Sequence, residues 1–371
     1  MPMMPFIARA RTLGLSMALA TAGLGVVATV PASAVGPTTW HVQAGNADDP
    51  TGMSVALEVT AFYNAHTFVH PGDHVLFRPV FGHTVTFNPI RIPGVPTFAY
   101  GNPAFPAGPT GNTLRFANRN GGALLNSGAF ATPPPPGAPP PGPGGPPPAP
   151  PTFTLNIGSD AAGPSVGEDG GRGTTYQFFC MFHRDMTGFI TVLPAGRELP
   201  STDASNQVRA QRAMEADLTR GKRALAKASR DADDNHVAAG LGISSIQRAG
   251  AVDILRFAPA TIEINAGESV TWVNEDINAP HTVTFGTERA GPGLLPYGGT
   301  TISSTSAQVS SGFLISQELI DYVNAGSLLP PGFVVTRQVT FTFLKPGIYH
   351  YICVLHDDLG MKGTVIVRAE D

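Results

Sequence analysis

Cysteine and charge are both scarce in this chain. Only two cysteines occur in 371 residues, and Lys, Arg, Asp and Glu together make up 13% of them. A formal net charge of -4 leaves no basic surplus of the kind that nucleic-acid binding requires. With 43 Gly and 36 Pro, the composition favours β structure, turns and inserted loops over helical bundles. We therefore expect a mainly β fold and no nucleic-acid partner.

Several catalytic patterns are also missing from the sequence. It contains no His-x-His pair, no phosphate-cradling Gly loop and no arrangement of nucleophile, His and acid. The carboxylates Glu263, Glu268 and Asp276 suggest no acid–base pair. We therefore do not expect an enzyme with a catalytic site of its own.

Residues 1–34 have the features of a secretory signal peptide. Arg9 and Arg11 precede an apolar run over residues 13–30, and Ala32-Ser33-Ala34 is a small-x-small cleavage site. The alternative is a membrane anchor, because the run approaches spanning length. We expect removal of the segment, no stable membrane insertion, and a protein secreted to the extracellular space or the periplasm.

Two short loops carry sulfur and imidazole donors in the same order. Each has a Cys, a His three residues further on and then a Met, and each is preceded by a distant His that begins the motif His-Thr-Val-Thr-Phe. Thiolate and thioether suit reduced copper, and imidazole suits both oxidation states. The motifs therefore predict two copper ions. The candidate ligands are His83, Cys180, His183 and Met186 in one set, and His281, Cys353, His356 and Met361 in the other.

A disulfide is the competing interpretation of the two cysteines. In an exported protein, Cys180 and Cys353 would ordinarily pair with each other. A disulfide explains neither the His and Met behind each Cys nor the matching upstream His. We expect free cysteines in the metal-loaded protein, and the disulfide stays open for the metal-free form.

The chain repeats itself with a period of 195 residues. Residues 41–78 align with residues 236–273 without a gap, so that His41 meets His236 and Gly45 meets Gly240. Alternating apolar residues between Gly and Pro turns indicate antiparallel strands. In the second copy we expect strands at residues 261–264, 269–273, 281–285, 339–343, 348–352 and 363–367.

The repeat divides the chain into two domains, residues 35–198 and 236–371. Residues 133–151 hold 13 prolines and are expected to form an extended loop at the rim of the first domain, or a ligand for a partner protein. Residues 199–235 are expected to form a mainly helical linker, with Asp203 or Ser201 as N-cap and Gly221 as its weak point. Its seven Lys or Arg indicate a solvated helix or a docking face for an acidic redox partner.

On these motifs, both copies resemble the cupredoxins, the plastocyanin-like blue copper proteins, across most of residues 40–194 and 236–369. The second loop looks like the plastocyanin spacing, and the first looks like the shorter amicyanin spacing. The resemblance implies an all-β fold of two tandem Greek-key sandwich or barrel domains, each with one type 1 (blue) copper. It also implies that His183 and His356 form the exposed edges through which electrons pass. The unequal loops predict unequal geometry and potential at the two coppers.

The function predicted in this way is electron transfer by an exported protein between redox partners that the sequence does not identify. Copper oxidases and nitrite reductases share the fold, but their blue-copper Cys has a neighbouring His, whereas Cys180 and Cys353 have none. The alternatives are copper storage, delivery or resistance, and an oxidoreductase completed at a subunit interface. His66, His70 and His74 could form an accessory metal site, or could be ordinary exposed strand residues.

Overall fold

The structure is a computed structural model in which Pro37–Asp371 form one compact unit. The predicted signal peptide (1–34) and the proline-rich segment (133–151) lie outside the described residues. No described helix combines the length and apolar character needed to cross a membrane. The described residues are 36–46, 53–54, 57–79, 83–88, 109–119, 121–128, 152–164, 172–232, 235–247, 250–287, 295–326 and 334–369.

The first copy consists of short strands, as the alternating pattern and the turn residues indicate. Its elements are β1 (Thr39–Ala44), β2 (Met53–Ser54), β3 (Leu57–Tyr63), β4 (His66–Val69), β5 (His74–Pro79), β6 (Thr86–Phe87), β7 (Thr113–Leu114), a 3-10 turn (Phe116–Asn118), β8 (Leu125–Asn126), β9 (Phe153–Ile157), β10 (Thr174–Phe179) and β11 (Thr187–Val192).

The second copy follows a long helix, α1 (Asp203–Arg230). Its elements are β12 (His236–Ser244), β13 (Gly250–Ala258), β14 (Thr261–Asn265), β15 (Ser269–Glu275), β16 (Thr284–Phe285), β17 (Thr301–Ile302), β18 (Val309–Ser310), β19 (Phe313–Leu314), α2 (Gln317–Gly326), β20 (Val335–Thr336), β21 (Gln338–Phe343), β22 (Gly347–Ile352) and β23 (Lys362–Arg368).

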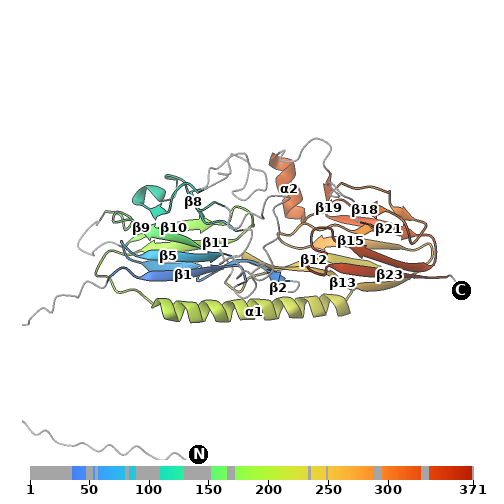
Figure 1. The fold of residues 1–371 in the computed structure, drawn as a ribbon, viewed down its shortest axis with the longest axis horizontal. Coiled ribbons are helices and arrows are strands. Elements are labelled where there is room, and N and C mark those ends of the chain that lie inside the picture. Colours follow the sequence, from blue (N-terminus) through green and yellow to red (C-terminus); the bar gives the residue numbers. More distant parts are fainter. Residues whose placement is uncertain are drawn as a thin grey trace, which may run out of the picture. The chain divides into compact units, whose positions relative to one another are not determined.

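One sheet runs through both copies (Figure 1), in the order β17-β21-β15-β12-β13-β3-β1-β5-β9-β7. Each copy adds a sheet of its own, β4-β11-β10-β6-β8 in the first and β14-β23-β22-β16-β18 in the second. A separate apolar core is buried in each copy; one contains Phe77 and Phe178 and the other contains Trp272 and Tyr351. Both copies are therefore β-sandwiches, as predicted.

The copies join where β3 of the first pairs antiparallel with β13 of the second. The pairing places Glu58 directly opposite Asp253. These residues also match in the repeat, so the junction brings equivalent strands of the two copies together. The long sheet therefore carries a pair of acidic side chains between the two sandwiches.

Helix α1 covers this junction on one side. Ala210 and Met214 are buried against β3 and β13, so the helix is partly packed and only one face is solvated. A Cβ at Gly221 would lie 3.1 Å from Leu57 and 3.2 Å from Val252, so this glycine permits close packing. Gly221 was expected only to weaken the helix, but it also lets the helix pack closely against the sheet.

Two local predictions were wrong. The N-cap of α1 is Thr202, whose side chain accepts a hydrogen bond from the Ser205 N–H. The carboxylate of Asp203 instead accepts hydrogen bonds from the backbone N–H and the ring of His41. The strand expected from His281 shrinks to β16, because His281 itself forms only an isolated bridge to Leu314.

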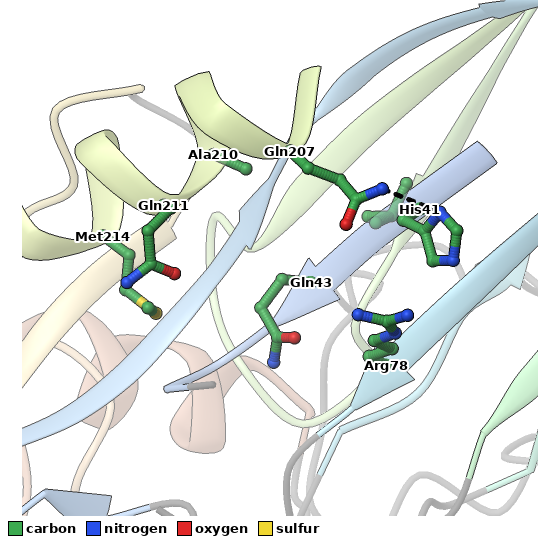
Figure 2. A pocket seen from close by; sticks show the side chains of 8 residues that line it. His41, Gln43, Arg78, Gln207, Ala210, Gln211 and Met214 are labelled. Carbon is green, nitrogen blue, oxygen red and sulfur yellow. Dashed lines mark hydrogen bonds between the residues drawn. The ribbon is translucent and has the colours of Figure 1, made fainter. Parts of the chain in front are cut away.

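A small hollow of about 100 Å³ lies between α1 and β1 (Figure 2). Figure 2 shows Gln207 reaching the ring of His41, while Arg78 and Met214 line other sides. None of the candidate copper ligands lines this hollow, so it is not part of either predicted site.

Candidate metal centres

The first ligand loop joins two neighbouring antiparallel strands. Cys180 directly follows β10 and Met186 directly precedes β11. The Cys180 N–H donates to the Met186 carbonyl at 2.9 Å, which closes the loop. His83 lies just before β6, the strand that pairs with β10 on its other side. The sheet therefore brings a residue from 97 positions upstream to the Cys loop.

The three nitrogen and sulfur donors of this loop form a compact triangle. The His83 and His183 Nδ1 atoms lie 3.0 Å apart, and the Cys180 Sγ lies 3.9 and 3.4 Å from them. All three residues are buried, and Met186 is fully buried. A single ion within the triangle would be in reach of all three donor atoms.

The second site repeats this geometry. The His281 and His356 Nδ1 atoms lie 3.2 Å apart, and the Cys353 Sγ lies 3.9 and 3.5 Å from them. The Cys353 N–H donates to the carbonyl of Met361, which is also fully buried. Among the described residues, these two triads are the groups of His, Cys and acidic side chains that could hold a metal ion.

A threonine after the upstream His fastens each loop. The Thr84 hydroxyl accepts from the Met181 N–H at 2.8 Å, and the Thr282 hydroxyl accepts from the Val354 N–H at 2.9 Å. Each bond ties the residue after the Cys to the residue after the distant His. The sequence prediction missed this role, although the repeated His-Thr-Val-Thr-Phe motif carried the signal.

Burial controls the protonation of the donors. It lowers the pKa of His183, His281 and His356 to about 3, and it lowers that of His83 well below the usual value, with a further contribution from His183. Burial also raises the pKa of Cys180 to about 11. Neutral imidazoles are ready to bind a cation, whereas a buried thiolate needs a nearby positive charge.

The donor set fits copper. Two imidazoles and one thiol converge at each site, and a buried Met closes the same loop. His₂Cys with a weak Met is the ligand combination of blue-copper electron-transfer sites. A metal ion would supply the positive charge that stabilises each thiolate.

Neither the disulfide nor the accessory metal site finds support among the described residues. Both cysteines are free and lie in separate triads. His66, His70 and His74 bond to three different partners, namely the Thr191 hydroxyl, the Arg197 carbonyl and the Asn156 side chain. These three histidines therefore do not converge on an accessory site.

The surroundings of the two loop histidines differ. His356 is partly exposed beside Leu355, which is 36% exposed, as expected for an outer edge. His183 is only 6% exposed, and its Nε2 lies 3.7 Å from Glu58. The expected exposed edge at His183 is therefore absent, because the ring faces the junction of the two copies.

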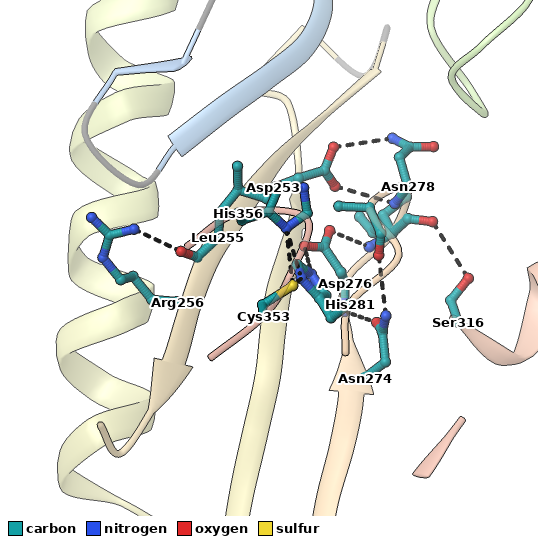
Figure 3. A network of polar contacts seen from close by, with 12 residues as sticks. Asp253, Leu255, Arg256, Asn274, Asp276, Asn278, His281, Ser316, Cys353 and His356 are labelled. Carbon is teal, nitrogen blue, oxygen red and sulfur yellow. Dashed lines mark hydrogen bonds and ion pairs between the residues drawn. The ribbon is translucent and has the colours of Figure 1, made fainter. Parts of the chain in front are cut away.

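A buried carboxylate supports the second site. The Nε2 of His281 lies 3.0 Å from Asp276, and neither side chain is exposed (Figure 3). Such a contact makes Nε2–H the donor and leaves Nδ1 free to bind a metal. Asp276 therefore orients a candidate ligand, a role that the sequence prediction did not give it. Figure 3 shows it between His281 and a further group of polar residues.

Comparisons with known proteins agree with this chemistry. The family of copper binding proteins described as the plastocyanin/azurin family matches residues 245–368. Plastocyanin of Scenedesmus fuscus is 32% identical over 114 residues, which cover 31% of this chain and 88% of that protein. Chloroplastic plastocyanin of Physcomitrium patens is 31% identical over 160 residues, which cover 43% of this chain and 76% of that protein. The chain belongs to the plastocyanin/azurin family.

Solved structures of cupredoxins also match the chain. A fern plastocyanin is 18% identical, covers 36% of this chain and 99% of its own, and gives a TM-score of 0.21. Amicyanin from Paracoccus versutus is 22% identical, covers 38% of this chain and 89% of its own, and also gives a TM-score of 0.21. The fold is all-β, as the sheets of the two copies show, with two tandem β-sandwiches and the long helix α1 between them in the sequence.

Family membership also gives a general function. Plastocyanin-like cupredoxins bind copper and carry electrons, and they are not enzymes. For this chain, membership of a family of copper binding proteins supports copper binding at that level. The number of ions, the ligands and the cellular location require a more specific proposal.

Proposed function

We propose that this protein is an exported electron carrier with one type 1 copper in each of its two domains, residues 35–198 and 236–371. The single observation that carries the proposal is the duplicated triad of two Nδ1 atoms and one Sγ, with all separations between 3.0 and 3.9 Å. The ligands would be His83, Cys180, His183 and Met186 at the first site, and His281, Cys353, His356 and Met361 at the second.

Copper held in this way alternates between its +1 and +2 states and so carries one electron per site. The protein's own residues keep the donor geometry constant. Thr84 and Thr282 fasten the Cys loops, and the Cys-to-Met backbone bonds close them. Apolar side chains such as Phe178 and Tyr351 fill the cores beside the sites and exclude water. A fixed, dry environment limits the rearrangement that a change of charge would otherwise cause.

The location and the partners belong to the same proposal. The signal-like residues 1–34 support export, and the neighbouring redox partners would be proteins that give or take single electrons. The linker, residues 199–235, carries exposed basic side chains on α1 that could face an acidic partner.

Copper(II) reconstitution tests this function. The expected result is two coppers per chain and an intense blue thiolate-to-copper absorption band. Cys180→Ser and Cys353→Ser should each remove one copper and part of the band. Met214→Leu, a change at a buried Met of the α1 contact, should keep both coppers.

A colourless protein, or one that binds a single copper, would refute the two-site proposal. Reversible oxidation and reduction of both sites at an electrode should accompany the colour. A blue protein whose sites fail to cycle would instead favour copper storage or delivery.

A further inference from the structure

A hydrogen bond joins the two ligand-bearing loops. The Arg184 N–H donates to the Asn278 Oδ1 at 2.8 Å. Arg184 directly follows His183, and Asn278 lies three residues before His281. The connection from one candidate copper ligand to the other therefore runs through the His183–Arg184 backbone, this hydrogen bond, the Asn278 side chain and the backbone from Asn278 to His281.

Asn278 is held firmly in this position. It is 7% exposed, and its Nδ2 donates to the Thr60 hydroxyl at 2.9 Å and more weakly to Asp253 at 3.4 Å. Its own N–H donates to Asp253 at 3.2 Å. These acceptors orient the amide so that its oxygen faces Arg184. Figure 3 shows Asn278 between Asp253 and the loop of His281.

A second series of contacts links the other faces of the two imidazoles. The His183 Nε2 lies 3.7 Å from Glu58, which pairs across the strands with Asp253. Burial and then the charge of Asp276 raise the pKa of Asp253, and Asp276 lies 3.0 Å from the His281 Nε2. Both series cross the junction between the copies, and all of these side chains come from the sheet or the loop beside it.

The two loop histidines differ in exposure, which indicates where each imidazole edge faces. His183 is 6% exposed and faces the junction, whereas His356 is partly exposed. The imidazole edge of the first site therefore points toward the second site.

We propose that the two sites exchange electrons within one chain through the Arg184–Asn278 hydrogen bond, with His356 as the side open to partner proteins. This inference rests on the proposed function, because it requires copper at both sites. In the transfer, copper(I) at one site becomes copper(II), and copper(II) at the other becomes copper(I). No bond breaks and no proton moves. A partner protein of the one-electron donor class supplies the electron at the second site.

The test uses the full chain with both coppers bound. A laser-generated flavin semiquinone supplies one electron, and the two blue bands are followed in time. We expect a first-order phase in which one site is oxidised as the other is reduced, at a rate independent of protein concentration. Asn278→Ala removes the acceptor of the Arg184 N–H from the path and should slow this phase severalfold. Asn265→Ala, at an exposed Asn of β14, is the matched control and should leave the rate unchanged.

Amide hydrogen exchange tests the Arg184–Asn278 hydrogen bond without any metal. Amide hydrogen exchange of Arg184 in the apoprotein should be slow, because Asn278 accepts its N–H, and it should accelerate in Asn278→Ala. If that variant folds poorly, Thr60→Val removes the acceptor that orients the amide and should slow the electron exchange in the same direction.

The outcomes separate the two proposals. Two bound coppers with no concentration-independent phase, or with the same rate in Asn278→Ala, would overturn the inference and leave the proposed function intact. Fewer than two coppers would refute the proposed function and remove the basis of the inference with it.

Discussion

The two candidate sites have the same ligands but different surroundings. Their Nδ1-to-Nδ1 separations are 3.0 and 3.2 Å, and their shorter sulfur-to-nitrogen separations are 3.4 and 3.5 Å. Yet His183 is buried at the junction, whereas His356 is partly exposed. A buried carboxylate, Asp276, supports His281. A duplicated loop thus reproduces the donor triangle, while the contact between the copies determines access and charge.

The largest expected effect comes from breaking that contact. Asp217 of α1 is completely buried, and its carboxylate accepts from the Tyr63 hydroxyl at 2.9 Å in the first copy. It also accepts from the Ser245 hydroxyl at 2.6 Å and the Ile246 N–H at 2.8 Å in the second. Asp217→Ala leaves these donors unpaired and should lower the free energy of unfolding by about 3 kcal/mol or more.

Urea denaturation measures this change. Glu215→Ala, at an exposed position on the same helix, is the control and should shift stability by no more than about 0.5 kcal/mol. If Asp217→Ala remains folded, His183 should become more accessible to solvent as the stability falls. An unchanged unfolding midpoint would show that α1 does not hold the copies together.

The next effect should be confined to the second site. Gly240 has φ +80°, and a Cβ there would lie 2.0 Å from the His281 Nε2. Gly240→Ala must displace this ring and should weaken copper binding at the second site about 10–100-fold, while the first site keeps its affinity. Copper titration of the Cys180→Ser and Cys353→Ser backgrounds separates the two sites.

Gly267→Ala provides the control for backbone strain. Gly267 has φ +91° but open space around its Cα, so the substitution should cost about 1 kcal/mol of stability without affecting copper. Equal copper affinities in the two variants would show that His281 tolerates the displacement.

The contrast between the sites also explains which features were predictable. The ligand sets follow from local spacing, because each Cys, His and Met shares one loop and each distant His starts a repeated motif. The junction depends on pairing β3 with β13, and strand alternation does not specify the partner of an edge strand. The role of Asn278 and the burial of His183 follow from that pairing, whereas the contact of Asp276 with His281 lies within the second copy. They could not be derived from the motifs.

A smaller effect is expected from the carboxylate beside His281. Asp276→Asn keeps the size of the side chain but removes the carboxylate that accepts the Nε2–H of His281. Copper affinity at the second site should fall about tenfold, and the reduction potential of that site alone should change. Voltammetry of the two-copper protein reports both sites together. Glu275→Gln, at the exposed neighbouring residue, should change neither the copper affinity nor the reduction potential. If Asp276→Asn shifted the potential of the first site only, Asp276 would not be the partner of a ligand of the second site.

The last effect concerns pH and the apoprotein. Burial raises the pKa of Asp253 well above its usual value, and the neighbouring Asp276 raises it further. The folded protein therefore keeps a proton that an unfolded Asp releases above about pH 4, so this group makes stability fall as pH rises from there toward the folded pKa. Asp253→Asn should remove up to about 1.4 kcal/mol per pH unit from that slope. Urea denaturation of the apoprotein at several pH values measures it, with Asp321→Asn as the exposed control. Asp253 lies opposite Glu58, so an unchanged slope would mean that Asp253 is ionised in the folded apoprotein and that the junction holds its negative charge.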